Sequence, residues 1–148
     1  MAHPAPYLLD TDILLLLLRG QGLGTAIDLK FQLTEQPFKP LISVVSVGES
    51  LAFAGRMGWS RRKIAALRRL LANFVWVDAN RLDVLHAYAE IATSWRCKEQ
   101  IPQNDMWIAA TASATGATLL TTEPRFTRLS EDLLICKLVN IKDGMIIG

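Results

Sequence analysis

The sequence has few of the residues that bind zinc or form cross-links. Its 148 residues include two cysteines and two histidines. Cys97 and Cys136 lack the paired spacing of a zinc site or a disulfide framework, so we interpret both as core thiols of a protein in a reducing cytoplasm. His86 has no second histidine, cysteine or acid at ligand spacing, and we interpret it as an ordinary helix histidine.

Long apolar runs and a strong charge imbalance are also missing. The apolar run of residues 7–18 is interrupted by Asp10, Thr11 and Asp12, and it is too short to span a bilayer. The N-terminus lacks the basic start of a signal peptide, so we expect a cytoplasmic protein that does not enter a membrane. The net charge of +2 is too small to imply a nucleic-acid partner by itself. A hydrophobic content of 51% excludes a disordered chain.

The order of apolar segments predicts an α/β fold with a mainly parallel sheet of four to five strands, flanked by helices, in one domain of residues 1–148. The strands are expected at residues 7–9, 41–45, 74–77, 118–121 and 133–139. The tail from Asn140 is expected to be a short edge strand or loosely ordered. One helix is expected to begin just after Thr11 or Asp12 and to end at about 18. Other helices are expected at 25–36, 46–57 and 60–71, from 80 or 81 to about 95, and from 104 or 105 to Gly116.

Four acids stand out by their position in this pattern. Asp10 and Glu123 follow strands, whereas Glu49 and Asp105 lie near helix starts that follow extended segments. In a doubly wound sheet, all four can converge at the carboxyl edge. Carboxylates packed together repel one another unless a cation lies between them, and carboxylate oxygens suit Mg²⁺ or Mn²⁺ rather than zinc. Such a metal site can activate water against a phosphodiester.

Simpler interpretations of these acids remain open. Asp10 or Asp12 could have no role beyond the start of the helix that follows them, for which we expect Thr11 or Asp12 to be the cap. Glu49, expected in a first helical turn, could be there because a negative charge is favoured at that end of the helix dipole.

A basic segment lies between the second and third predicted strands. Residues 51–75 carry six positive charges and no negative one. The apolar residues of the helix at 60–71 define one face, so the cations must project outward. They form either a solvated surface or a surface that contacts phosphates. The candidate nucleic-acid-binding residues are Arg61, Arg62, Arg68 and Arg69.

Four blocks of the sequence resemble the PIN-domain ribonucleases, and particularly the VapC-type toxins of toxin–antitoxin modules. They are residues 9–12, 43–51, 101–110 and 120–126, which follow the family's order and span nearly the whole chain. The resemblance implies a Mg²⁺- or Mn²⁺-dependent endoribonuclease. Its four acidic positions are taken by Asp10, Glu49, Asp105 and Glu123, of which the first three are expected to bind the metal. Thr11 and Thr121 take supporting positions.

The chain departs from the family's pattern at two positions. Asp12 stands where the family usually has Asn or Ser, so it either adds a ligand or only caps the helix. Glu123 replaces the more usual Asp, and its longer side chain would reach the metal directly or through a water.

The resemblance also implies partners: an RNA substrate, an antitoxin that covers the acidic site, and a second copy in a homodimer. We expect Trp59 to be exposed for contact with a partner helix, and Leu51 and Phe53 to be core residues.

Three rival functions remain open at this stage. One is a PIN-fold RNA-processing nuclease without an antitoxin, and another is a catalytically inactive PIN-fold binding module. The third is a haloacid-dehalogenase phosphatase, which Asp10-Thr11-Asp12 resembles in its first residues. Leu14 stands where that motif has Thr or Val, and we find no suitable acidic pair after a lysine downstream.

Overall fold

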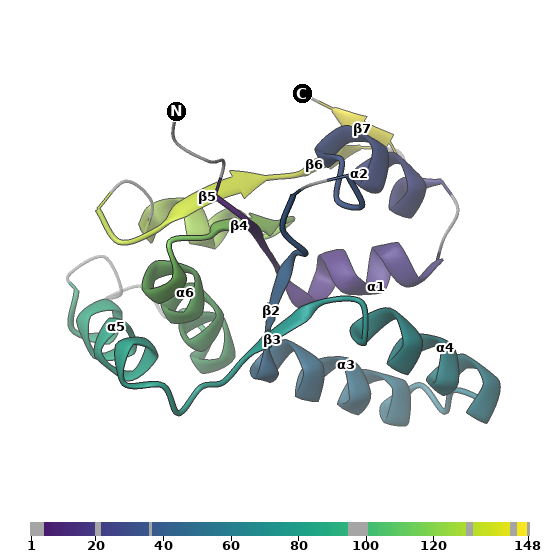
Figure 1. Ribbon diagram of the computed structural model, residues 1–148, viewed down its shortest axis with the longest axis horizontal. Coiled ribbons are helices and arrows are strands. Elements are labelled where there is room, and N and C mark those ends of the chain that lie inside the picture. Colours follow the sequence, from purple (N-terminus) through teal and green to yellow (C-terminus); the bar gives the residue numbers. More distant parts are fainter. Residues whose placement is uncertain are drawn as a thin grey trace.

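A parallel sheet forms the centre of the structure, which is a computed structural model (Figure 1). The structure describes residues 5–19, 22–35, 37–94, 101–129, 132–142 and 145–147. The sheet has five strands in the order β3-β2-β1-β4-β5, and all neighbouring pairs are parallel. The strands are β1 (Tyr7–Leu9), β2 (Leu41–Ser43), β3 (Val75–Val77), β4 (Thr118–Thr121) and β5 (Ile135–Leu138). The predicted fold class is confirmed.

The central strands are short and apolar without alternation because helices cover both faces of the sheet. In the pair β1–β4, Leu8 lies opposite Leu119 and Leu9 opposite Leu120. All four leucines are fully buried. Leu8 and Leu119 belong to the core on one face, whereas Leu9 and Leu120 belong to the core on the other.

The helices divide between these two cores (Figure 1). On the face of Leu8 lie α5 (Leu82–Thr93) and α6 (Gln103–Thr115), together with the 3-10 helix η2 (Pro124–Leu129). On the face of Leu9 lie α1 (Thr11–Arg19), α2 (Leu23–Phe31), α3 (Val44–Arg56) and α4 (Arg61–Leu71). None of the described helices is long and apolar enough to cross a membrane.

Two of the predicted elements end earlier than expected, each because of local capping. The helix predicted at 25–36 ends at Phe31, where Gln32 adopts the left-handed conformation and Leu33 N–H donates to Asp28 C=O in a helix-closing bond. The strand predicted at 41–45 ends at Ser43, whose Oγ accepts from Val45 N–H and starts α3 at Val44. Predictions that involve Gln36, Trp95 and Cys97 lie outside the described residues.

The tail after Val139 forms strands apart from the main sheet. The segments β6 (Asn140–Lys142) and β7 (Met145–Ile147) pair antiparallel with each other. The tail is therefore a small second sheet, neither an edge strand of the main sheet nor loosely ordered along these segments. It lies beside α2 (Figure 1).

Gly24 of α2 lies against the backbone of α1. A Cβ atom at this position would overlap the carbonyl oxygen of Leu16. We therefore expect Gly24→Ala to lower the free energy of unfolding by about 1–3 kcal/mol, because the two helices would have to separate. Urea denaturation measures this change.

The matched control is Gly55→Ala on α3. A Cβ atom at Gly55 meets no atom within 4 Å. Alanine is favoured over glycine inside a helix by roughly 0.5–1 kcal/mol, so this variant should be more stable than the wild type. A Gly24→Ala variant that is as stable as Gly55→Ala would contradict the close approach.

Candidate active site

An acidic cleft lies where the winding direction of the sheet reverses. The chain passes from β1 outward through β2 to β3, and then returns to β4 on the other side of β1. Open α/β sheets form binding crevices at the carboxyl ends of the strands flanking such a point. Here the crevice is a cleft of about 220 Å³. It is lined by Asp10, Thr11, Asp12, Leu15, Glu49, Phe53, Arg56, Asp105, Glu123 and Arg125. The four acids predicted from the sequence therefore line one cleft.

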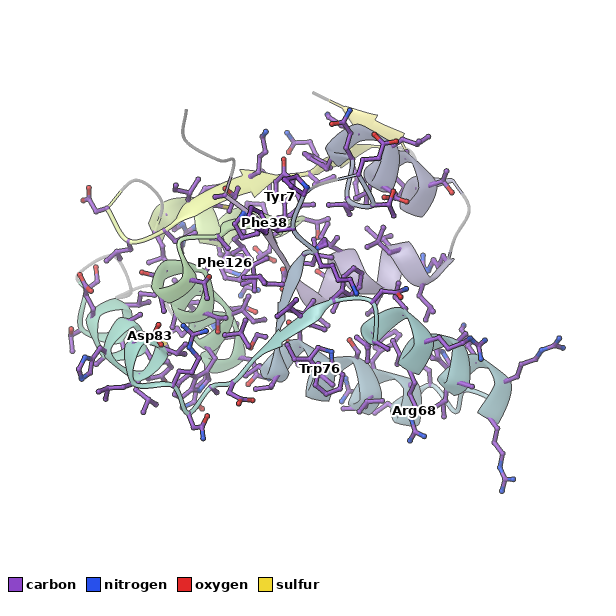
Figure 2. All side chains as sticks on the ribbon, viewed as in Figure 1. Tyr7, Phe38, Arg68, Trp76, Asp83 and Phe126 are labelled. Carbon is purple, nitrogen blue, oxygen red and sulfur yellow. The ribbon has the colours of Figure 1, made fainter. Side chains whose placement is uncertain are left out.

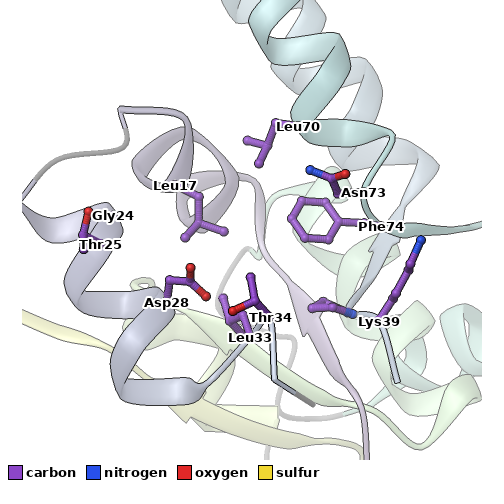
Figure 3. Close-up of a pocket in the computed structure, with 11 residues that line it drawn as sticks. Leu17, Gly24, Thr25, Asp28, Leu33, Thr34, Lys39, Leu70, Asn73 and Phe74 are labelled. Atoms are coloured by element: carbon purple, nitrogen blue, oxygen red, sulfur yellow. The ribbon is translucent and has the colours of Figure 1, made fainter. Parts of the chain in front are cut away.

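A larger cavity lies on the side of the molecule that carries α1, α2 and α4 (Figure 3). Its volume is about 570 Å³, and its walls include Leu17, Asp28 and Leu70. None of the predicted site residues lines it. Size alone therefore does not identify the site, and the chemistry is concentrated in the smaller cleft.

Asp10 connects the sheet to α1 and is 5% exposed. Its N–H donates to Leu120 C=O at 3.0 Å, which extends the pairing of β1 with β4, and its C=O accepts from Leu14 N–H. Asp10 is thus the N-cap of α1, whereas the sequence pointed to Thr11 or Asp12. Its carboxylate accepts hydrogen bonds from Thr11 N–H at 2.8 Å and from the Thr121 hydroxyl at 2.6 Å.

Burial raises the pKa of Asp10 from 3.8 to about 7. The hydrogen bonds from Thr121 and Thr11 act in the opposite direction, and the negative charges of Asp12 and Asp105 add to the rise. Burial outweighs the hydrogen bonds because a charge inside the protein loses its hydration. Asp10 therefore lies in a position that favours either a proton or a cation.

The same environment acts on Asp105, in the first turn of α6. Burial raises the pKa of Asp105 to about 6, and Arg125 lowers it. The negative charges of Glu49 and Glu123 raise it further. Like Asp10, Asp105 has a carboxylate whose ionised form needs more positive charge nearby than the protein supplies.

Glu49 is oriented by neutral donors. The Thr11 hydroxyl lies 2.7 Å from Glu49 Oε1 and 3.0 Å from Ser46 Oγ. A hydroxyl has one hydrogen, and the carboxylate cannot donate, so Thr11 donates to Glu49 and accepts from Ser46. The Asn104 amide lies 3.3 Å from Glu49 Oε2. Because α3 begins at Val44, Glu49 is in its second turn, where the helix dipole does not explain its presence.

Asp12 and Thr121 have different places around the cleft. Asp12 is exposed, and its carboxylate accepts from the Thr122 hydroxyl at 3.3 Å. Thr121 is fully buried, donates to Asp10, and accepts from Glu123 N–H at 2.9 Å. Thr121 therefore connects the end of β1 to the segment that carries Glu123.

Arg125 is a cleft residue to which the sequence assigned no role. Its Nη2 lies 3.3 Å from Glu123 Oε2 and 3.5 Å from Asp105 Oδ2, and its Nε lies 3.0 Å from Glu123 Oε1. The Nε–H is buried and not aligned with an acceptor among the described residues, so the Nε contact is an ion pair only. Burial raises the pKa of Glu123, but the hydrogen bonds and charge of Arg125 outweigh it and hold that pKa below its usual range.

The donor chemistry of the cleft fits a hard divalent cation. Among the described residues, no three acidic, histidine or cysteine side chains are placed to share one ion as they stand. Mg²⁺ commonly uses only one or two carboxylates and completes its shell with water. Asp10 and Asp105, whose pKa values are raised, are the carboxylates that a cation would stabilise most.

The four candidate arginines of α4 do not line the cleft. Arg61, Arg62, Arg68 and Arg69 are all exposed, and Arg68 points away from the body of the protein (Figure 2). The outward projection predicted from the apolar face is confirmed. The cation of the basic segment that reaches the cleft is Arg56, in the last turn of α3.

The expected exposure of Trp59 and burial of Leu51 are both wrong. Trp59 is half-buried, with its ring edge against Phe53 at 5.7 Å and Lys63 Nζ 4.1 Å above it. Leu51 is 39% exposed and Met57 61% exposed. Phe53 is half-buried and lines the cleft.

The raised pKa of Asp10 predicts a pH-dependent stability. The folded protein holds the proton more tightly than the unfolded chain, so this stabilisation is complete below about pH 4 and is lost as the pH rises to about 7. Asp10→Asn imitates the protonated form. In EDTA, the free energy of unfolding of the wild type should fall between pH 5 and pH 8 by roughly 1–3 kcal/mol more than that of Asp10→Asn. Thermal or urea unfolding measures the difference, and parallel curves would contradict the raised pKa.

Solved structures with a similar fold include several VapBC complexes. The chain is similar to VapBC2 of Rickettsia felis bound to promoter DNA, with 22% identity, 89% of this chain and 97% of that chain covered, and a TM-score of 0.74. It is similar to VapBC-1 of nontypeable Haemophilus influenzae, with 21% identity and a TM-score of 0.68, and the match covers 89% of this chain and 96% of that chain. It is also similar to VapBC-5 of Mycobacterium tuberculosis, with 19% identity and a TM-score of 0.62, and the match covers 93% of this chain and 100% of that chain.

At these identities the likeness shows the fold. A search of curated proteins gives no match. Residues 7–132 match the family described as PIN domain. This range contains β1 to β4 of the main sheet and the four predicted acids that line the cleft. The chain therefore belongs to the PIN domain family.

Proposed function

We propose that this protein is a Mg²⁺- or Mn²⁺-dependent endoribonuclease and the toxin of a toxin–antitoxin pair. The observation that carries the proposal is the convergence of Asp10, Glu49, Asp105 and Glu123 on one cleft of a PIN fold. These acids come from four segments far apart in the sequence. A fold that needed them only for capping or solubility would have no reason to gather them.

The residues of the cleft have separate tasks in the proposed hydrolysis. A divalent ion, when bound, supplies positive charge that activates water and offsets the charge of the phosphodiester. Asp10, Asp105 and Glu49 would hold it. Thr11 fixes two of these carboxylates at once, since its N–H donates to Asp10 and its hydroxyl donates to Glu49. Such second contacts keep ligands oriented before the ion arrives.

The structural neighbours support an antitoxin as a partner. The neighbours described above are VapBC complexes, one of them bound to a DNA fragment from its promoter, and VapBC-5 is described as a member of a family of toxin–antitoxin systems. We propose that this chain likewise pairs with an antitoxin that covers the acidic cleft, and that it forms a homodimer. RNA would approach along the hollow over α3, since Arg56 and Glu49 line both the acidic cleft and a second hollow of about 350 Å³ beside it. The exposed arginines of α4 would add contacts to more distant phosphates.

One observation favours a second candidate, a PIN-fold binding module without catalysis. In the structure, no three of the described acidic side chains are placed to share one ion, and Arg125 already pairs with two of the acids. Metal binding separates the two candidates, because a binding module has no need of a cation in the cleft.

Removal of one acid should abolish or strongly weaken metal binding. In titration calorimetry with Mn²⁺, we expect Asp105→Asn to lower the affinity at least about tenfold, since even residues that only orient ligands have effects of this size. Asp83→Asn is the matched control. Its carboxylate pairs with Arg81 at 2.7 Å on an exposed part of the surface, so Mn²⁺ binding should equal that of the wild type. Equal binding by Asp105→Asn and Asp83→Asn would refute the assignment.

Cleavage should depend on the same cleft. With Mg²⁺, the purified protein should cut single-stranded or looped RNA, and Asp10→Asn should abolish the cutting while the protein stays folded. Expression of the wild type should arrest cell growth, and expression of Asp10→Asn should not. Denaturing gels of a labelled RNA with and without EDTA measure the cleavage. Cutting that resists EDTA, or that persists in Asp10→Asn, would rule out the proposed reaction.

A further inference from the structure

Several contacts join Glu123, which lies between β4 and η2, to Arg125 of η2. Arg125 Nη2 donates to Glu123 Oε2 at 3.3 Å, and Arg125 N–H donates to Glu123 Oε1 at 3.1 Å. Arg125 Nε lies 3.0 Å from the same Oε1. Pro124 stands between the two residues and fixes the backbone dihedral φ in the turn. Both oxygens of Glu123 therefore have partners before any ion arrives.

The same guanidinium extends to Asp105. Arg125 Nη2 lies 3.5 Å from Asp105 Oδ2, and the Asp105 side chain is only 19% exposed. Glu49, Glu123 and Asp12 also act on Asp105, and all three are acids. Arg125 thus offsets the negative charge of Asp105, and an ion that binds Asp105 must compete with it.

We propose that Glu123 is a positioning residue for Arg125 rather than a metal ligand, and that Arg125 exchanges Asp105 for an RNA phosphate when a divalent ion binds. This inference rests on the proposed function. The planar guanidinium offers paired donors to phosphate oxygens, and Glu123 keeps it at the wall of the cleft after Asp105 is taken by the ion. Glu123 would then serve the substrate by holding the positive charge of Arg125 in place, and it would not bind the metal with its own negative charge.

Mn²⁺ calorimetry tests the first half of the proposal. The affinity of Glu123→Gln for Mn²⁺ should lie within about threefold of that of the wild type, because this substitution removes no metal ligand. Asp105→Asn, in contrast, removes a metal ligand. Arg125→Ala should bind Mn²⁺ up to about fivefold more tightly, since a partly exposed ion pair that competes with the ion has been removed. A metal ligand and a positioning residue thus give different results for the same substitution at Glu123.

RNA binding tests the second half. The probe is a fluorescein-labelled single-stranded RNA in Ca²⁺, confirmed intact on a denaturing gel and followed by fluorescence anisotropy. Arg125→Ala should weaken binding at least about tenfold, as expected for a lost hydrogen-bonded charge pair. Arg128→Ala is the matched control, because it removes the same charge from an exposed residue of η2 that does not line the cleft, and it should have a smaller effect. The double variant Glu123→Gln/Arg125→Ala should bind no more weakly than Arg125→Ala alone, because Glu123 acts through Arg125.

The possible failures can be told apart. If Glu123→Gln loses Mn²⁺ as completely as Asp105→Asn, Glu123 is a metal ligand and this inference is wrong while the proposed function stands. If Arg125→Ala and Arg128→Ala weaken RNA binding equally, Arg125 has no special place at the substrate. If the wild type binds neither Mn²⁺ nor RNA, the proposed function and this inference are both wrong.

Discussion

The structure depends on one buried carboxylate at the end of the central strand. Asp10 follows β1, is the N-cap of α1, and receives hydrogen bonds from its neighbour Thr11 and from Thr121 of β4. The bond from Thr121, together with the bond from Asp10 N–H to Leu120 C=O, joins the two strands between which the winding direction reverses. Burial nevertheless outweighs the hydrogen bonds to the carboxylate and raises the pKa of Asp10 to about 7. The protein thus places a charge where only a proton or a cation can fully compensate it.

The rest of the cleft follows from this constraint. Carboxylates gathered at one edge of a sheet repel each other, and the chain limits that repulsion with its own groups. Thr11 and Asn104 bind Glu49, Thr122 binds Asp12, and Arg125 lies between Glu123 and Asp105. Each partner is weaker than a divalent ion at short range, so the arrangement can persist without metal and still give way to it.

The sequence was enough to predict the sheet and the convergence of the acids, because both depend on the order of the segments. Asp10 and Glu123 follow apolar strands, and strand ends meet at one edge in parallel sheets. The finer errors have local causes. Asp10, Thr11 and Asp12 can all cap a helix, so the sequence does not distinguish among them. Leu51 was expected inside because leucine is apolar, but the buried stripe of α3 includes Ser46 and Ser50, whose hydroxyls have partners within the protein.

Arg125 was missed for a different reason. It belongs to the short 3-10 helix η2, which the sequence indicates only as a turn without periodicity, and neither its charge nor its neighbours indicate that it faces into the cleft. The only available signal was its spacing of two residues from an acid across a proline. The basic segment on α4 gave a stronger signal, yet its candidate arginines lie outside the cleft, and Arg56 at the end of α3 reaches it instead.

The most direct test of the central claim is a crystal structure of the protein with Mn²⁺, in which anomalous scattering locates the ion. We expect an anomalous peak in the cleft, coordinated by Asp10 and Asp105, with the guanidinium of Arg125 moved away from Asp105. A well-ordered cleft without a peak at saturating Mn²⁺, or a peak bound only by residues elsewhere, would contradict the account.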